Sequence, residues 1–256
     1  MQLLESSLGA YVIPIEIHQN DIMEPAGVDE FFTNLVTELP HAYADRVTSI
    51  ETDGKTVTTQ ILKSLERQPS DKMNVAALLS EDKSTLKVQV KYSFLKELEN
   101  DGYKVSCVLV EDDFVGGNIE YNQRNDYWTG AYGEMGGYEN LPRIIRGDQM
   151  VYRNVVREYQ PSFAGAEIEK KDIIIGDSLF YEINFSIESN WSLNNISLIS
   201  LFIATDGSVN NAFKLSLNEA LSNDFVDGNG TSLNEIKNNS GFNVYPNPSN
   251  GITNLV

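Results

Sequence analysis

The sequence predicts an α+β protein in which an α/β segment over residues 1–70 precedes an antiparallel β-sandwich over residues 71–222. Apolar residues in the first segment recur at helical spacing between strand-like runs, whereas beyond residue 71 apolar and polar residues alternate with period two. The chain has 256 residues, which is more than one hydrophobic core usually contains and favours more than one domain.

Three helices are expected in the first segment. Residues 3–8 predict the last turns of one helix, which Gly9 ends. Apolar residues at helical spacing predict a second helix over 31–39. A third, amphipathic helix is predicted over 57–65, with Asp53 as its cap.

Two strands are expected between these helices. Residues 11–18 (YVIPIEIH) form an apolar run typical of a strand buried on both faces, although Pro14 cannot donate a hydrogen bond in a ladder. Residues 42–50 predict the second strand. The resulting order of helix, strand, helix, strand and helix is typical of an α/β segment.

Six runs in the second part alternate between apolar and polar residues. They are residues 86–94, 103–110, 150–159, 179–187, 196–205 and 211–217. Repeated strands without helices between them are typical of a β-sandwich. A long connection over 111–149, rich in Gly, Tyr and Trp, interrupts the pattern, and residues 223–242 have the polar, Asn- and Gly-rich composition of a linker.

The charge of the chain excludes one class of partner. With 37 acidic and 19 basic residues, the net charge is −18, which repels nucleic-acid phosphates, so no nucleic acid is expected to bind. No stretch approaches the roughly 18 apolar residues of a membrane helix, so we expect a chain that does not span a membrane. The N-terminal residues lack the features of a signal peptide, which indicates another export route or a missing N-terminus.

Cys107 is the only cysteine, so no internal disulfide forms. It lies between Val105 and Leu109 on one face of a predicted strand, where we expect a buried, inert thiol. A nucleophilic cysteine needs a basic partner, and the sequence indicates none. We therefore predict no catalytic residue and no cofactor.

The long connection is the candidate ligand loop. Tyr127, Trp128, Tyr132 and Tyr138 lie there among several glycines. Aromatic residues on a long loop are typical of contacts with a peptide or a sugar. The alternative, which we favour, is that these rings pack down as a satellite core over the edge of the sandwich.

The C-terminal residues 244–251 (VYPNPSNG) form the most specific motif, in which two prolines stiffen the chain before a Ser-Asn-Gly turn. After a polar linker, this motif resembles the opening of the type A sorting domain of the Bacteroidota type IX secretion system. Residues 243–256 then correspond to part of that domain, and the type IX machinery is the implied partner. The matching residues are Val244, Tyr245, Pro246, Asn247, Pro248, Asn250 and Gly251.

The body resembles the outer membrane protein 28-related family of the same bacteria, whose members join a thioredoxin-like region to a β-sandwich. The resemblance rests on four stretches in the same order, at residues 12–18, 39–46, 103–112 and 152–157. It implies that residues 1–70 are a truncated thioredoxin-like segment that lacks its first strand.

In a thioredoxin-like layout, His18 and His41 lie at one edge of the sheet, with Asp21 and Glu24 close by. Imidazole and carboxylate ligands together suit zinc. Because the sequence has no His-x-x-x-His or similar spacing, we favour two surface histidines and expect no metal.

A thioredoxin-like oxidoreductase needs a Cys-x-x-Cys pair at a helix N-terminus, and this sequence has none. We therefore expect a non-catalytic protein with a binding or structural role, at the cell surface in association with the outer membrane, or secreted, whose ligand is a peptide or glycan. Two alternatives remain. One is a fragment of an envelope thioredoxin-like thiol-disulfide oxidoreductase, and the other is a glycan-binding β-sandwich module.

Overall fold

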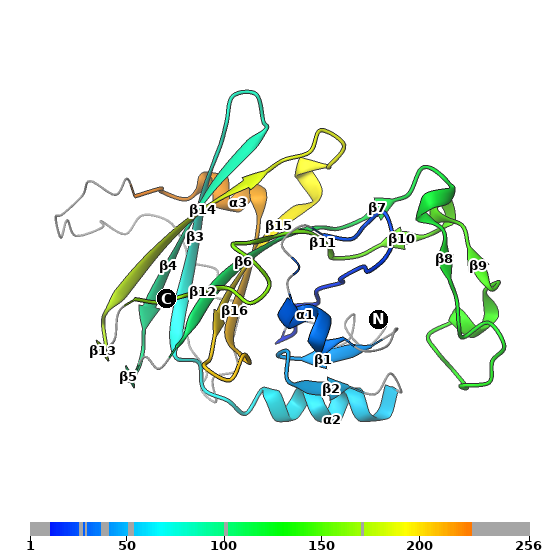
Figure 1. Ribbon diagram of the computed structural model, residues 1–256, viewed down its shortest axis with the longest axis horizontal. Coiled ribbons are helices and arrows are strands. Elements are labelled where there is room, and N and C mark those ends of the chain that lie inside the picture. Colours follow the sequence, from blue (N-terminus) through cyan, green and yellow to red (C-terminus); the bar gives the residue numbers. More distant parts are fainter. Residues whose placement is uncertain are drawn as a thin grey trace, which may run out of the picture.

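The computed structural model describes residues 11–25, 28, 30–36, 41–50, 54–99, 102–169 and 172–226. Two antiparallel sheets form its centre (Figure 1). The N-terminal elements lie on the far side of the five-stranded sheet from the three-stranded sheet, and a narrow arm extends away from the body. The predicted β-rich, antiparallel architecture is confirmed for the part of the chain that the structure describes.

The three-stranded sheet has the order β14-β4-β3. Its strands are β3 (Asp71–Leu79), β4 (Thr85–Phe94) and β14 (Ser178–Ser186). Period-two patterning predicted β4 and β14, but β3 was missed. Three consecutive residues of β3, Val75 to Ala77, are buried, so the strand has no clean alternation for sequence reasoning to find.

The five-stranded sheet is built around β6 (Lys104–Glu111) and β15 (Ile196–Ile203). β11 (Val155–Gln160) and β12 (Ala166–Glu167) pair with β6, while β16 (Val209–Ser216) pairs with β15. Both central strands are buried along almost their whole length, because other layers cover both faces of the sheet.

One core lies between the two sheets. It joins the inward residues of β4 and β14, such as Val88 and Phe185, to Leu109 and Leu198 of the five-stranded sheet. The buried hydroxyl of Tyr92 lies 2.8 Å from Ser200 Oγ, so this core satisfies its polar group with a hydrogen bond across the two layers.

A short helix, α3 (Leu217–Ser222), closes one end of this core, with Leu217 and Ala220 buried. Ser216 and Glu219 form a capping box at its start. The last predicted strand run ends at residue 217, and this helix was not predicted. The Ser-x-x-Glu spacing was the signal that indicates this helix.

The N-terminal elements are α1 (Glu30–Leu35), β1 (Ala42–Ala44), β2 (Thr48–Ile50) and α2 (Gly54–Ser64). Both described helices fall within or near predicted ones. The single strand predicted over 42–50 is instead a hairpin, because Asp45 and Arg46 adopt φ values of 49° and 69° and turn the chain back. Residues 3–8, Gly9 and Asp53 lie outside the described residues.

The strand predicted over residues 11–18 was also wrong. In this stretch the structure has a single parallel bridge, in which Glu16 N donates to Asn154 O and Val156 N donates to Glu16 O. Pro14 has no amide hydrogen to extend the pairing. The apolar residues Ile13, Ile15 and Ile17 instead pack with α1 onto the five-stranded sheet.

The remaining strands are short. β5 (Leu98–Glu99) pairs with β13 (Asp172–Ile173) at one end of the three-stranded sheet. The arm contains β7 (Phe114–Val115) with β10 (Val151–Tyr152), and β8 (Gln123–Arg124) with β9 (Ile144–Ile145).

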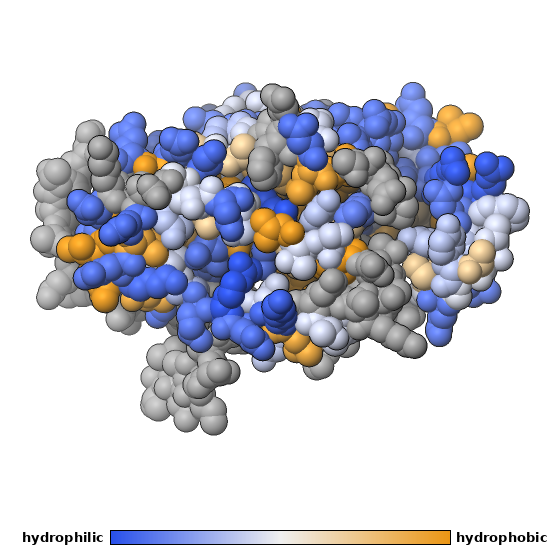
Figure 2. Space-filling model, turned by 60° about the horizontal axis from the view of Figure 1, so that its bottom comes forward, coloured by the Kyte–Doolittle hydropathy of each residue, from blue (hydrophilic) through white to orange (hydrophobic). Residues whose placement is uncertain are grey.

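The surface drawn in Figure 2 is mostly hydrophilic, with hydrophobic residues in small separate groups. One group lies at the left of the view. Leu95, Ile174 and Ile175, which are close to β5 and β13 in the sequence, are exposed. Among the described residues, no helix has the length and apolar character that a membrane crossing requires.

Candidate functional site

The long connection predicted over 111–149 folds into the arm, residues 114–152 (Figure 1). Two short antiparallel ribbons build it: β7 with β10 next to the body, and β8 with β9 farther out. We call residues 125–143, which connect β8 to β9, the tip. The arm leaves β6 and returns through β11, so its base sits on neighbouring strands of one sheet.

A buried ion pair fixes the base of the arm. Arg157 Nη2 lies 2.7 Å from Glu111 Oε2, and the two side chains are only 10% and 2% exposed. Glu111 also accepts a hydrogen bond from Ser192 N, and the Arg157 guanidinium stacks on Phe114 at 4.5 Å. Because the pair is desolvated, it is stable only while both partners keep their hydrogen bonds. These bonds therefore fix the position at which the arm leaves the sheet.

Tyr121 packs the arm against its own base. Its side chain lies over Gly116 and Gly147, where an added Cβ would come within 2.2 Å and 2.5 Å of Tyr121 Cβ. Its ring contacts Phe114, and the Tyr152 hydroxyl donates to the Tyr121 carbonyl. Together with Met23, these residues form a small core of their own.

The N-terminal segment meets the arm at a polar junction, which comprises Glu16, His18, Asp21 and Gln123. His18 Nδ1 lies 2.8 Å from Asp21 Oδ2, and the same carboxylate oxygen accepts from Gln123 Nε2 at 3.0 Å. His18 Nε2 is 3.5 Å from Glu16 Oε1, a separation typical of an ion pair rather than a hydrogen bond. The junction thus links the N-terminal segment to β8.

The junction holds a charged imidazolium. Burial by itself would lower the pKa of His18, but the carboxylates of Asp21 and Glu16 outweigh it and raise that pKa to about 9. The paired imidazolium in turn helps to lower the pKa of Asp21 against the effect of its own burial. At neutral pH, His18 therefore serves as a cation and not as a general base.

The structure gives His18 and His41 separate partners. His41 Nε2 lies 2.9 Å from Ser49 Oγ and its ring stacks on Tyr43, within the β1–β2 hairpin. Glu24, the other carboxylate considered, accepts from Asn20 N. The prediction of two surface histidines was wrong for His18, which is buried. Among the described residues, no group of three His, Cys, Asp or Glu side chains is arranged to hold a metal ion.

Cys107 is buried in the core between the two sheets. Burial raises the pKa of its thiol to about 12, because the apolar surroundings do not stabilise a thiolate. At neutral pH the sulfur is thus protonated and screened from solvent, which fits the inert side chain expected from the sequence.

A buried asparagine organises the tip of the arm. Asn125 is 4% exposed, and its Nδ2 donates to the carbonyls of Tyr138, Leu141 and Pro142, while its Oδ1 accepts from Tyr127 N. Glu139 Oε2 likewise accepts from Met135 N and Gly137 N. These bonds from side chains to the backbone hold both sides of the loop together.

The tip displays aromatic rings to solvent. Tyr132 is 70% exposed and Trp128 is 47% exposed, while Tyr127 is half-buried and meets Tyr132 edge to face at 5.7 Å. Tyr138 is also half-buried. The structure therefore divides the aromatic residues of the connection: Tyr121 packs into the core of the arm, and Trp128 and Tyr132 project from the tip.

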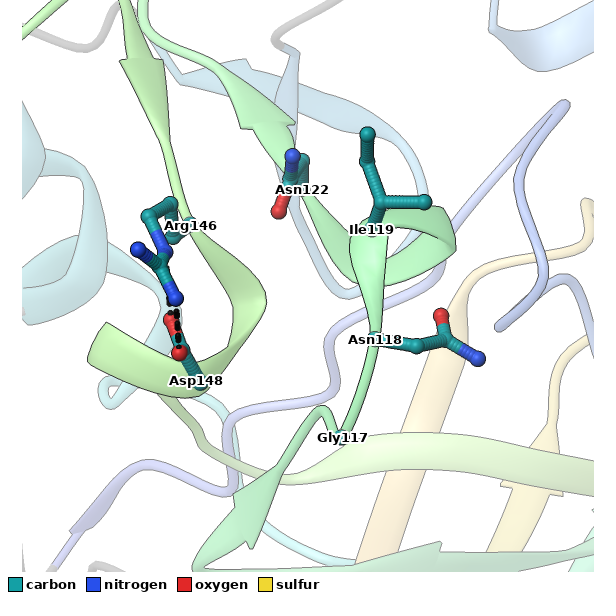
Figure 3. A pocket seen from close by; sticks show the side chains of 6 residues that line it. All are labelled: Gly117, Asn118, Ile119, Asn122, Arg146 and Asp148. Atoms are coloured by element: carbon teal, nitrogen blue, oxygen red, sulfur yellow. Dashed lines mark hydrogen bonds and ion pairs between the residues drawn. The ribbon is translucent and has the colours of Figure 1, made fainter.

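A shallow depression of about 300 Å³ lies beside the outer ribbon, lined by Gly117, Asn118, Ile119, Asn122, Arg146 and Asp148. Arg146 and Asp148 point toward each other and form an ion pair, while Asn118 points away from them (Figure 3). Both charges at this depression are thus already paired.

The residues of the sorting motif, Val244 to Gly251, lie outside the described residues. Sequence reasoning missed the junction and the role of Asn125. Gln123 and Asp21 are far apart in the chain and carry no motif. At the tip, Asn-Asp before an aromatic pair was a local sign of a turn, beside the glycines already noted.

The fold and the site define an antiparallel β protein with an arm that displays aromatic residues. No protein-family model and no curated protein matches this chain. Among solved structures, HBP35 of Porphyromonas gingivalis is similar with a TM-score of 0.50 and 11% identity, over 79% of this chain and 62% of HBP35. This chain therefore spans less than two thirds of the length of HBP35.

A domain of the outer membrane lipoprotein Omp28 from Porphyromonas gingivalis also matches, with a TM-score of 0.30 and 14% identity, over 58% of this chain and 88% of that domain. At 11% identity, the likeness to HBP35 shows a common fold and nothing more specific.

Proposed function

We propose that this chain is a non-catalytic binding protein of the bacterial cell surface, or a secreted one, that contacts a peptide or glycan ligand through the tip of its arm. One observation carries the proposal. Trp128 and Tyr132 are exposed on a loop that a buried asparagine holds in shape, whereas many of the large rings of the body, such as Tyr92 and Phe202, are buried.

Exposed aromatic residues on a preformed loop suit recognition for two reasons. Each ring offers a large apolar area with little conformational entropy to lose, and a loop already held by hydrogen bonds needs little further ordering on binding. The depression beside the outer ribbon is a weaker candidate because its arginine is already paired.

Two side chains that could perform chemistry, Cys107 and His18, support a non-catalytic role. The Cys107 thiol is buried with its pKa raised to about 12, and His18 is held as a cation with its pKa raised to about 9. Neither group is in the protonation state that a nucleophile or a general base requires at neutral pH. The likeness to HBP35 concerns the fold alone and assigns no reaction.

Export and family are further parts of the proposal. The motif at residues 244–251 supports export by the type IX machinery, and the ordered resemblances in the body support an outer membrane protein 28-related origin. The hairpin β1–β2 followed by α2 is compatible with a remnant of a thioredoxin-like segment in the first seventy residues. Replacing Pro246 and Pro248 by alanine should then leave the protein inside the cell envelope of a type IX-competent host.

Ligand binding is tested with Trp128 as the reporter. The chain has two tryptophans, so Trp191→Phe leaves Trp128 as the single tryptophan whose emission reports on the tip. Panels of glycans and of extended peptides are titrated while its emission is followed, which separates the two ligand classes. Binding should be lost on Tyr132→Ala and kept on Phe180→Ala, since Phe180 is an exposed ring on β14. A protein that responds to neither panel, or is insensitive to Tyr132→Ala, would contradict the proposal.

A further inference from the structure

The outer face of the three-stranded sheet carries a side chain whose burial the sheet alone does not explain. On β4, Val88 and Val90 face the core between the sheets, so Gln89 points outward. Gln89 is nevertheless only 4% exposed. Residues 223–226, which follow α3 and which we call the strap, lie against it.

Gln89 binds the strap through its backbone. Gln89 Nε2 donates to Val226 O at 2.7 Å, and Val226 N donates to Gln89 Oε1 at 3.0 Å, so one side-chain amide pairs with both backbone groups of one residue. Gln89 Nε2 also donates to Glu182 Oε1 at 2.9 Å, which orients the amide from the neighbouring strand β14. The side-chain amide of Gln89 thus makes the two hydrogen bonds that a backbone residue of a neighbouring strand would make.

Two further contacts locate the strap. Asn223 Nδ2 donates to Val75 O of β3 at 2.7 Å. The Phe225 ring lies 4.8 Å from Lys87 Nζ, and the same ammonium forms an ion pair with Glu182 at 2.9 Å. The strap therefore touches all three strands of this sheet directly or through one side chain.

We infer that the outer face of the three-stranded sheet is a binding surface for an extended peptide, and that the strap of this chain occupies it. Recognition uses the backbone of the residue held by Gln89 and an aromatic side chain one position before it, over Lys87. In this way the start of the C-terminal region is fastened to the sheet. The surface is distinct from the tip of the arm and does not depend on its function.

Because the strap occupies this surface, competition between the strap and an added peptide can be tested. A separate peptide of the same sequence has to displace the strap. Its apparent affinity is therefore its intrinsic affinity multiplied by the fraction of molecules in which the surface is open. Val226→Pro removes the amide hydrogen that donates to Gln89 and should release the strap. Val226→Ala keeps that hydrogen and is the matched control.

The experiment uses the full chain and a labelled peptide of residues 222–227 (SNDFVD). We expect the peptide to bind the Val226→Pro protein about tenfold or more tightly than the wild type or Val226→Ala. Binding should be lost when Gln89→Leu is added or when the peptide phenylalanine is replaced by alanine. Hydrogen exchange of the amides of residues 223–225 should be faster in Val226→Pro than in Val226→Ala.

Two results would overturn the inference. The first is equal exchange at residues 223–225 in the two variants, which means that Gln89 does not hold the strap. The second is failure of the peptide to bind Val226→Pro, or binding that survives Gln89→Leu. If Gln89→Leu does not fold, Lys87→Met tests the aromatic contact instead, and the same loss of peptide binding is expected.

Discussion

At the scale of single residues, His18 was expected at the surface but instead links the N-terminal segment to the arm. A histidine at the end of an apolar run is ordinarily expected at the surface. Here residues of the arm and the N-terminal segment surround it, and two carboxylates keep it protonated. Its role is to supply the positive charge that lets Asp21 and Glu16 lie close to the body of an acidic protein.

The raised pKa of His18 predicts a pH dependence of stability. Because the folded state raises this pKa from 6.5 to about 9, the contribution is fully present below pH 6.5 and is lost as the pH rises toward 9. We expect up to about 3 kcal/mol of the free energy of unfolding to disappear over that range. Urea unfolding of wild type and His18→Gln at several pH values checks this.

In that experiment His41→Gln is the control, since His41 lies on the hairpin and contacts only Ser49 and Tyr43 among the interactions described. It should keep the pH dependence of the wild type, while His18→Gln should be nearly flat between pH 6.5 and 9. A wild type that is equally stable at both ends of this range would show that His18 is not held as a cation.

The ion pair at the base of the arm gives a second prediction at residue scale. Arg157→Met leaves Glu111 buried without its partner, so we expect a loss of about 3–5 kcal/mol in the free energy of unfolding. Arg124→Met removes the exposed pair with Asp126 and should cost about 0–1 kcal/mol. Denaturant unfolding of the two variants compares them, and similar losses would contradict the assignment of a buried pair.

At the scale of elements, the arm depends on close approach of Tyr121 to two glycines. Gly147→Ala places a Cβ 2.5 Å from Tyr121 Cβ and 3.1 Å from its backbone, so the outer ribbon has to shift. We expect a loss of about 1–3 kcal/mol and faster hydrogen exchange around β8 and β9. Equilibrium unfolding and exchange measurements provide the readout.

Gly117→Ala is the matched control for this change. An added Cβ at Gly117 meets nothing within 4 Å, although this residue is adjacent to Gly116. Its stability should stay within about 0.5 kcal/mol of the wild type. If both alanine variants behave alike, Tyr121 does not fix the arm in the way described.

At the scale of the whole molecule, the layers differ in how firmly they are held. The strands β6 and β15 are covered on both faces, whereas β1, β2 and α2 contact mainly one another. We expect amides of residues 104–111 and 196–203 to exchange far more slowly than those of residues 42–64. Native-state hydrogen exchange followed by mass spectrometry checks this order, and equal protection would show that the N-terminal elements are not the weaker unit.

Much of the architecture could be read from the sequence where burial follows a regular period. β4 and β14 have one face to the core and one face outward, so their apolar residues alternate, and the helix α2 keeps an apolar stripe. β3 could not be found in this way, because its middle residues are buried on both faces. The apolar run at 11–18 misled for another reason: its burial comes from packing onto a sheet that it joins through a single bridge only.

The site divides along the same line. The sequence by itself determined that an aromatic, glycine-rich connection interrupts a β-rich chain, that no paired thiols are present, and that the chain is strongly acidic, because these are properties of composition and local order. Only the tertiary structure decided which rings face solvent, that Gln123 and Asp21 meet at His18, and that Gln89 holds Val226. Those contacts join residues up to 137 positions apart, and no local pattern records which distant strands fold together.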